Sequence, residues 1–296
     1  MMIFFFYSFF KKYHIANMSN QHVLSFLFPD GPYFSGATAG IQGEFVRHVY
    51  MSAAVSLKAS ESSFISLMEI GSWTGASTLT WCQAIDSYCP DAGEVLCVDP
   101  WSPYYSEEQN EQGENYRIMS NMAGLDIVYD LFLHNIKFAQ QSTPVKHMRG
   151  KSIDIPPLLK EESFDVIYID GDHAYESALY DIRLAKQLVK IGGFICGDDL
   201  EVQGAESDLE FIKKNLKYDF LRFPEKNLAF HPGVTLAVYE EFSEVSAYHG
   251  FGIMRKVAED KFGKVSLSGQ PGFIPSHFPE REKEMVRETL GQSFQT

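Results

Sequence analysis

The sequence has few cysteines and few basic residues, and each shortage disfavours a class of protein. Its cysteines, Cys82, Cys89, Cys97 and Cys196, form no C-x-x-C pair and no zinc-ligand spacing. Cys97 and Cys196 lie in apolar runs, so we expect buried thiols in a reducing compartment. Lysine and arginine number 25 against 39 aspartate and glutamate residues, which gives a net charge of −14. This charge disfavours a nucleic-acid partner but suits a cationic ligand or a metal ion.

The chain also lacks a hydrophobic run long enough to cross a membrane. Its most apolar segment, Met1–Phe10, reads MMIFFFYSFF, whereas about 20 residues are needed to span a bilayer. A secretory signal carries its positive charge before the apolar run, but here Lys11 and Lys12 follow it. Met18 begins an ordinary polar segment. We therefore expect residues 1–17 to be an extension outside the fold, and a membrane-surface anchor is the less favoured alternative.

What the sequence does contain is an alternation of strand-like and helix-like segments, within 296 residues that are 45% hydrophobic. Short apolar runs ended by Gly, Pro, Arg or Asp predict buried parallel strands. They are Phe64–Ile70, Glu94–Val98, Val145–Met148, Phe164–Ile169 and Gly193–Cys196. Helical patterns at Ser77–Ser87, Tyr175–Lys190 and Ser207–Leu216 lie between and after them. This order predicts an α/β doubly wound, mostly parallel sheet with helices on both faces.

The remaining segments suggest how the chain is organised around this sheet. Residues 18–267 form one expected domain, and Phe220–Phe223 with Val234–Tyr239 is predicted to be a terminal antiparallel pair. The long connection at residues 101–144 is aromatic and acidic, which is typical of a lid. Residues 268–296 read as a peripheral tail that ends in a charged helix.

Small or acidic residues follow each predicted strand. Because the carboxyl ends of parallel strands share one edge of a sheet, these residues are expected to meet where ligands bind. The segments concerned are Glu69–Gly75, Asp99, Gly150–Ser152, Asp170–His173 and Asp198–Asp199.

The first of these segments, EIGSWTG, is a tight glycine turn that opens a helix. Gly71 and Gly75 allow close approach of a ligand, but their G-x-x-x-G spacing is not the dinucleotide-binding G-x-G-x-x-G. Glu69 would repel a phosphate and suits an amino-bearing ligand. Asp99 can accept two hydrogen bonds from ribose hydroxyls. The alternative is a helix-starting turn and an Asp-Pro turn without a ligand.

On these residues the segment from about Ser63 to Tyr239 resembles the class I S-adenosylmethionine-dependent methyltransferases. EIGSWTG is similar to their first motif and VDP, at Val98–Pro100, to their ribose-binding site. The resemblance implies a seven-stranded Rossmann-like sheet, with Glu69 near the amino acid end of the cofactor and Gly150–Ser152 near the adenine. The cofactor-binding residues that it implies are Glu69, Gly71, Trp73, Gly75, Ser77, Asp99, Ser152 and Asp170.

The segment IDGDHAYESALYDIRLAKQLVKIGGFICGDDL narrows the resemblance to the macrocin O-methyltransferase and cephalosporin-hydroxylase-like group, called methyltransferase family 24. Catechol O-methyltransferases are more distant. The likeness implies a divalent cation, Mg²⁺, held by Asp170, Asp198 and Asp199. Independently, clustered carboxylates require a compensating cation, and oxygen ligands favour Mg²⁺, Mn²⁺ or Ca²⁺. The alternative is that these aspartates cap a helix and shape a turn.

Methyl transfer to a hydroxyl also needs a base, and two neighbouring residues are candidates. His173 titrates in the right range, and its position carries the base in macrocin-type relatives, whereas other relatives use the Asp172 position. His173 as a purely structural ring is the third alternative. Weaker candidates for the acceptor site, each with a structural alternative, are Trp101, Tyr104, Tyr105, Glu201, Glu206 and His231.

These observations predict a cytosolic, S-adenosylmethionine-dependent and metal-assisted O-methyltransferase that acts on a small molecule. A sugar or natural-product hydroxyl is the expected acceptor. A catechol is disfavoured, because His173 stands where catechol-type enzymes carry lysine and Asp199 where they carry asparagine. The alternatives are a cephalosporin-hydroxylase-like protein with different chemistry and a cofactor-binding protein without turnover. A homo-oligomer is compatible with the sequence.

Overall fold

A computed structural model describes residues 20–91, 93–103, 114–139, 143–155, 158–206, 208–223 and 228–291. The predicted extension at residues 1–17, and Tyr104 and Tyr105, lie outside these ranges. Among the described residues, no helix is both long and apolar enough to cross a membrane.

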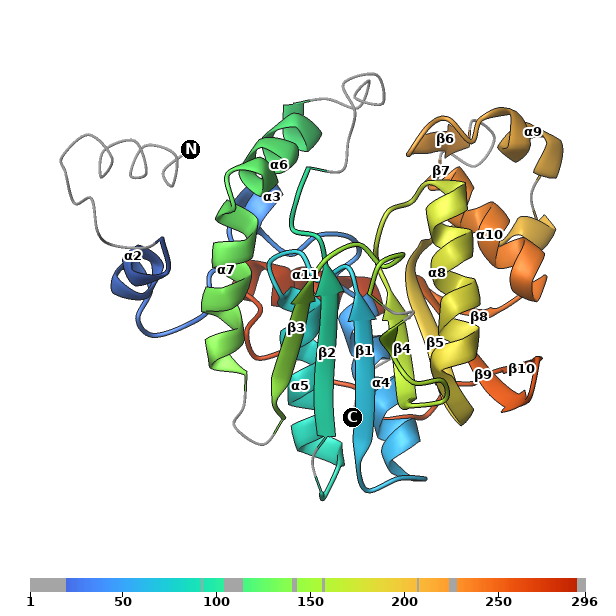
Figure 1. Cartoon of the computed structure of the whole chain (residues 1–296), viewed down its shortest axis with the longest axis horizontal. Coiled ribbons are helices and arrows are strands. Elements are labelled where there is room, and N and C mark those ends of the chain that lie inside the picture. Colours follow the sequence, from blue (N-terminus) through green and yellow to red (C-terminus); the bar gives the residue numbers. More distant parts are fainter. Residues whose placement is uncertain are drawn as a thin grey trace.

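A twisted central sheet organises the molecule (Figure 1). Its strand order is β10-β9-β5-β4-β1-β2-β3, and β8 pairs with β9. The strands are β1 Ile65–Ile70, β2 Gly93–Asp99, β3 Val145–Arg149, β4 Phe164–Ile169, β5 Val189–Leu200, β8 Ser246–Tyr248, β9 Gly250–Ala258 and β10 Lys261–Lys264. The strands β1 to β5 pair with one another in parallel, whereas β9 pairs in antiparallel fashion with β5, β8 and β10. The doubly wound sheet is therefore confirmed, with eight strands rather than seven.

Helices cover both faces of the sheet, because alternate strand residues point in opposite directions. On β1, Leu67 packs into the larger core cluster with α4, α5 and α7, while Met68 packs into a second cluster with α8. The helix α10 packs against α8 through a further cluster of apolar residues. These helices are α4 Arg47–Ala59, α5 Ala76–Tyr88, α7 Ile127–Asn135, α8 Tyr175–Leu188 and α10 Pro232–Phe242.

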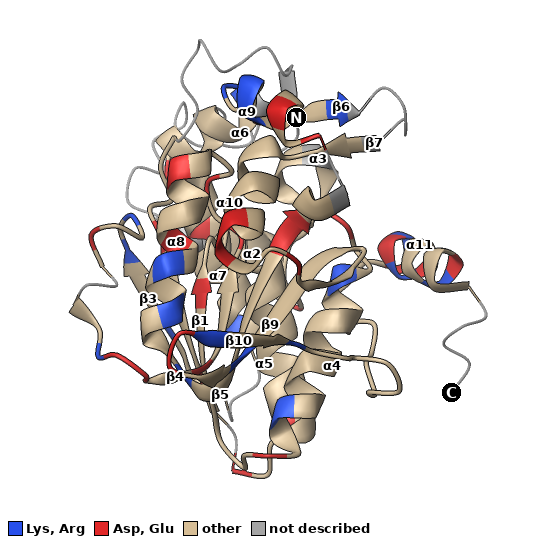
Figure 2. Ribbon diagram, turned by 90° about the vertical axis from the view of Figure 1, so that its right-hand side faces the viewer, with Lys and Arg blue, Asp and Glu red and all other residues tan. Residues whose placement is uncertain are grey.

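The remaining elements lie at the periphery. Figure 2 shows Lys and Arg on β10, at the end of the sheet away from α9 and α6. A two-stranded sheet, β6 with β7, is separate from the central one. The elements are α2 Asn20–Leu27, α3 Gly36–Ala39, α6 Glu114–Gly124, η2 Ile136–Phe138, η4 Gly204–Glu206, α9 Leu209–Lys214, β6 Leu221–Phe223, β7 Leu228–Phe230 and α11 Glu280–Leu290.

One prediction about the later segments was wrong. Val234–Tyr239 is not a strand but part of the helix α10, because Pro232 supplies a helix-starting φ angle and a short apolar run has no decisive period. The predicted strand at Phe220–Phe223 is present as β6, but its antiparallel partner is β7. Within residues 101–144, for which the sequence predicts a lid, the described residues form the helices α6 and α7 and the short helix η2.

Candidate active site

A large cleft opens at the carboxyl ends of the parallel strands. The strand order reverses between β1 and β4, which is the switch point where open α/β sheets bind ligands. The cleft has a volume of about 910 Å³. This volume is at the upper end of the range for small-molecule sites, roughly 300–1,000 Å³. The cleft therefore has room for a cofactor and a second small molecule.

The glycine turn, residues 71–75, forms one wall of the cleft. Gly71 has φ +82°, and a Cβ there would lie 1.8 Å from the backbone oxygen of Asp170. The close approach is fixed by two backbone bonds, from Gly71 N–H to the Val98 carbonyl and from Asp170 N–H to the Ile70 carbonyl. Only glycine fits this crossing, so position 71 joins the ends of β1, β2 and β4.

Asp99 ties the end of β2 to this turn. Its Oδ2 accepts hydrogen bonds from the backbone N–H groups of Ser72 (2.9 Å) and Trp73 (3.0 Å), and its Oδ1 accepts one from Trp101 N–H (2.6 Å). Burial raises the pKa of Asp99, although these three bonds act in the opposite direction. A carboxylate offers about four acceptor positions, so one remains for a ribose hydroxyl. The two bonds expected from the sequence exceed this capacity.

Glu69 lies beneath the turn rather than in the cleft. Its carboxylate is fully buried, and its Oε2 accepts hydrogen bonds from the hydroxyls of Ser72 and Thr78. Neither Glu69 nor Gly75 lines the cleft, whereas Gly71, Trp73 and Ser77 do. Burial raises the pKa of Glu69, and hydrogen bonds from neighbouring hydroxyls partly offset this. Its position supports the turn and gives no direct contact for the cofactor.

A buried acid also lies at the far end of the cofactor wall. Asp181, on α8, and Ser152, after β3, both line the cleft. Burial raises the pKa of Asp181 to about 7, although its hydrogen bond with Ser152 acts to lower this pKa. Ser152 was predicted from the sequence to be near the adenine, but Asp181 was not identified as a site residue.

A second wall, which meets the glycine turn at Asp170, carries the acidic cluster Asp170, Asp198 and Asp199, which follows β4 and ends β5. The cluster meets a cation that the sequence analysis missed. Arg47, the first residue of α4, is 4% exposed, and its guanidinium contacts Asp198 and lies 3.2 Å from Asp170 Oδ2. Gly43 makes room for it, since a Cβ there would lie 2.0 Å from Arg47 Nη1. Two of the three aspartates therefore already share a positive charge.

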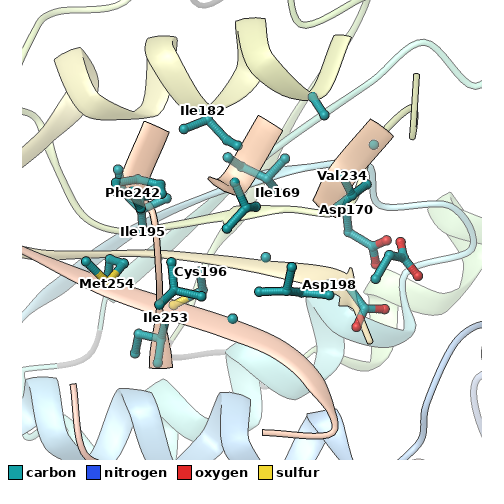
Figure 3. A pocket seen from close by; sticks show the side chains of 18 of the residues that line it. Ile169, Asp170, Ile182, Ile195, Cys196, Asp198, Val234, Phe242, Ile253 and Met254 are labelled. Atoms are coloured by element: carbon teal, nitrogen blue, oxygen red, sulfur yellow. The ribbon is translucent and has the colours of Figure 1, made fainter. Parts of the chain in front are cut away.

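The floor beneath this cluster is apolar. Figure 3 shows Asp170 and Asp198 at one end of a small cavity whose other labelled side chains are mostly aliphatic or aromatic. The cavity is about 60 Å³ and is lined by residues such as Ile182, Ile195 and Phe242. Burial raises the pKa of Asp170, and Arg47 partly counteracts it. A low-dielectric floor strengthens every charge interaction in this half of the cleft.

His173 lies between two carboxylates. Its Nδ1 is 2.9 Å from Asp219 Oδ1 and its Nε2 is 3.0 Å from Asp199 Oδ2. Burial lowers the pKa of His173, but Asp199 and Asp219 outweigh it and hold the pKa well above its usual value. The partner Asp219 comes from the segment before β6, 46 residues further along the chain, and no sequence motif pointed to it.

Asp172, the alternative base, has other bonds. Its Oδ1 accepts a hydrogen bond from Ala174 N–H at 3.2 Å, and its Oδ2 accepts one from the Ser177 hydroxyl at 2.8 Å. It lines the cleft but shapes the entry into α8, in agreement with the turn-forming alternative. No side-chain cap formed by Asp198 or Asp199 is found among the described residues; the side-chain cap of α9 is Asp208.

Several other predicted residues also reach the cleft. Trp101, Glu201 and His231 line it. Trp101 is fully buried and donates a hydrogen bond from its indole N–H to the Trp73 carbonyl. It therefore serves as a support for the glycine turn as well as a wall. A signal for Arg47 existed in the sequence, because it is a lone cation in the apolar run FVRHV.

Comparison with known proteins agrees with this architecture. Residues 68–200 match the family model Methyltransf_24, described as a methyltransferase domain, and so cover the glycine turn through the end of β5. The protein R132 of Acanthamoeba polyphaga mimivirus is 30% identical over 93 residues, which are 28% of this chain and 42% of that protein. The chain thus matches less than half the length of that relative.

Solved structures with similar folds include several methyltransferases. CalS11, a TDP-rhamnose 3'-O-methyltransferase, is 13% identical, with a TM-score of 0.39 over 71% of this chain and 78% of that one. The O-methyltransferase from Bacillus cereus in complex with SAH is 15% identical, with a TM-score of 0.37 over 80% and 84%. At these values the likeness adds nothing to the argument about residues.

The glycine turn, its partner Asp99 and the acidic cluster all lie within residues 68–200, the segment that matches the methyltransferase domain of the Methyltransf_24 family model. The match agrees with the sequence resemblance to methyltransferase family 24.

Proposed function

We propose that this enzyme transfers the methyl group of S-adenosylmethionine to a hydroxyl oxygen of a small molecule, with His173 as the base. The observation that carries the proposal is the position of His173 in the wall of the cleft, with Asp219 2.9 Å from its Nδ1. A carboxylate on Nδ1 fixes the tautomer. Nε2, which lies 3.0 Å from Asp199 Oδ2, would then exchange a proton when the acceptor hydroxyl takes the place of that carboxylate.

The cofactor side of the proposal follows the glycine turn. Gly71, Trp73 and Ser77 would lie along the cofactor, Asp99 would accept one ribose hydroxyl, and Ser152 would lie near the adenine. All five line the cleft, which supports this assignment. Asp170, at the crossing with Gly71, is the residue that would lie between cofactor and acceptor.

The reaction that we propose is balanced by a single proton transfer. The acceptor oxygen attacks the sulfonium methyl, a C–O bond forms and the C–S bond breaks, so the sulfur leaves as a neutral thioether. The hydroxyl proton passes to Nε2 of neutral His173, and Asp219 stabilises the resulting imidazolium. A positioned base of this kind contributes roughly 10²–10⁴-fold to the rate.

The acceptor that we propose is rich in hydroxyl groups, such as a sugar or a polyhydroxylated natural product. The cleft is also lined by polar side chains that can bind several hydroxyls, and about 910 Å³ accommodates more than the cofactor. These polar side chains include Gln42, Glu44, Lys151 and Glu176. Hydrogen-bonding sites of this kind discriminate strongly against analogues that lack the hydroxyl.

Metal assistance is part of the proposal, and the residues fit a cation only in part. Asp170, His173 and Asp199 each offer a donor atom within 4.8 Å of the others. Asp198 and Asp170, however, are both paired with Arg47. Asp199 would therefore be the aspartate that holds a divalent cation, in place of the predicted three. A bound cation supplies a lower pKa for an acceptor hydroxyl.

Transfer of labelled methyl tests the proposed function. The full chain is incubated with methyl-labelled S-adenosylmethionine and a panel of sugars and phenolic or aliphatic alcohols, with and without chelator. We expect label in a methyl ether of at least one polyhydroxylated acceptor. Binding of S-adenosylhomocysteine without any transfer across the panel would instead favour a cofactor-binding protein, and label on nitrogen or carbon would contradict O-methylation.

A further inference from the structure

A second group of donor atoms shares Asp199 with the acidic cluster. Asp199 and Glu201 flank the end of β5, and His231 precedes the first residue of α10. One donor atom of each lies within 4.8 Å of the other two. All three residues line the active-site cleft.

The distances within this group are those of metal ligands rather than of hydrogen bonds. His231 Nδ1 lies 3.4 Å from Glu201 Oε1 and 3.8 Å from Asp199 Oδ1. N–H···O hydrogen bonds cluster near about 2.9–3.0 Å. Ligand atoms that share a metal at about 2.0–2.2 Å are separated by roughly 3.0–3.6 Å in octahedral or tetrahedral geometry. The 3.4 Å separation between His231 and Glu201 therefore fits a shared cation, and the 3.8 Å separation between His231 and Asp199 is slightly longer than this range.

Two donor atoms of the group have no hydrogen-bond partner among the described residues. His231 is 6% exposed, and its buried Nδ1 accepts no hydrogen bond and donates none. Glu201 Oε2 is also buried and has no hydrogen-bond partner among the described residues. A buried polar atom without a partner costs about 1–3 kcal/mol. Because Nδ1 faces two carboxylates and has no hydrogen-bond partner, a cation bound between the three groups would remove this cost.

The surroundings hold these ligands in place. His173 lies 3.0 Å from Asp199 Oδ2, so the other oxygen, Oδ1, faces His231. The rings of His173 and His231 have centroids 4.2 Å apart, and Phe220 packs on His231 at 5.0 Å. Gly233 packs so closely that a Cβ there would lie 2.2 Å from the His173 carbonyl oxygen. Outer contacts of this kind orient metal ligands in proteins.

We propose that Asp199, Glu201 and His231 form a binding site for a first-row divalent transition metal, Mn²⁺ or Zn²⁺. One imidazole and two carboxylates suit these ions, whereas Mg²⁺ prefers oxygen ligands alone. Arg47 contacts Asp170 and Asp198 but not Glu201, and it carries a single positive charge, so a cation beside Asp199 and Glu201 would balance negative charge that Arg47 leaves. The inference deepens the proposed function, because it rests on a cation that adjoins His173 and it names that cation's ligands.

Direct metal binding tests the site without any turnover. The full chain is stripped with chelator and titrated with Mn²⁺, Zn²⁺ and Mg²⁺ by calorimetry, and the Mn²⁺ complex is examined by pulsed electron paramagnetic resonance. We expect one equivalent of Mn²⁺ or Zn²⁺, binding at least tenfold tighter than Mg²⁺, and modulation from an imidazole nitrogen. His231→Gln should weaken Mn²⁺ and Zn²⁺ binding by 10-fold or more and remove the nitrogen signal.

The controls separate this site from the alternatives. His249→Gln, an exposed histidine outside the cleft, should bind metal like the unsubstituted chain. Asp198→Asn should also retain binding; a loss there with normal binding in His231→Gln would overturn the proposal in favour of the three aspartates. Equal metal binding by His231→Gln and the unsubstituted chain would overturn it as well. Titration with S-adenosylhomocysteine reports on folding and on the proposed function separately, because cofactor affinity does not depend on His231.

Discussion

The charged side chains of the two walls of the cleft have different kinds of partner: backbone N–H groups on the cofactor wall and other charged side chains on the catalytic wall. On the cofactor wall, Asp99 accepts N–H groups from the turn beside it, within 27 residues of the chain. On the catalytic wall, Asp170 is paired with Arg47 over 123 residues, and His173 with Asp219 over 46. On the first wall, three backbone N–H groups occupy most of the acceptor positions of the Asp99 carboxylate. The second contains side-chain charges that a substrate or metal can reorganise.

This difference assigns a role to each wall. A wall made of backbone donors keeps its shape when the ligand leaves, which suits a cofactor that binds in every cycle. A wall of paired carboxylates and histidines can exchange protons and partners at little structural cost. Removing a group from the catalytic wall is therefore expected to change turnover or stability strongly, and removing one from the cofactor wall to change affinity.

The largest expected effect is on catalysis. His173→Ala should lower the turnover number by roughly 10²–10⁴-fold, because the acceptor hydroxyl loses its base. Affinity for S-adenosylhomocysteine, measured by calorimetry, should not change. Since base catalysis needs neutral His173 and Asp219 raises its pKa, Asp219→Asn should shift the pH–rate profile toward acid. A normal rate in His173→Ala would transfer the role to Asp172.

The next effect is on stability. Arg47→Leu leaves Asp170 and Asp198 buried without their counter-charge, so it should lower the free energy of unfolding by about 3–5 kcal/mol. The control is Arg255→Leu, whose pair with Glu61 is partly exposed and should cost only about 0–1 kcal/mol. Urea denaturation measures both. Adding Asp198→Asn to Arg47→Leu should recover part of the loss; similar losses in the two single variants would contradict a central role for Arg47.

A pH dependence follows from Asp181. Its pKa is raised to about 7 in the folded state from 3.8, so the folded chain holds a proton that the unfolded chain has lost. This stabilisation is fully present below about pH 4 and is lost as the pH rises through 7, by roughly 4 kcal/mol at most. Asp181→Asn should therefore flatten the stability curve between these pH values. Parallel curves for the variant and the unsubstituted chain would rule out a raised pKa.

The smallest expected effect is on affinity. Asp99→Ala should weaken binding of S-adenosylhomocysteine by about 1–3 kcal/mol, because a ribose hydroxyl and the N–H groups of the turn lose their acceptor. Asp91→Ala, an exposed aspartate before β2, serves as the control. Calorimetry distinguishes them. Unchanged affinity in Asp99→Ala would show that the turn holds the cofactor without this carboxylate.

The sequence predicted the features that depend on residues close together in the chain, and it did not predict contacts between residues that are far apart in the chain. Strand ends marked by Gly or Asp placed the glycine turn and the acidic cluster correctly, because these signals lie within a few residues of the element that they end. Arg47 and Asp219 could not be predicted as partners, since only the packing of α4 and of the segment before β6 brings them to the cleft. The sequence predicted that Glu69 contacts the cofactor. Its burial beneath the turn could not be predicted, because the burial depends on hydrogen bonds from Ser72 and Thr78.

A crystal structure of the complex with S-adenosylhomocysteine tests the central claim most directly. Our account predicts that a ribose hydroxyl contacts Asp99, that the adenine lies toward Ser152 and that the sulfur faces His173 across open space for the acceptor. A complex in which the sulfur points away from His173, or in which the ligand lies outside the cleft next to Gly71, would contradict the account.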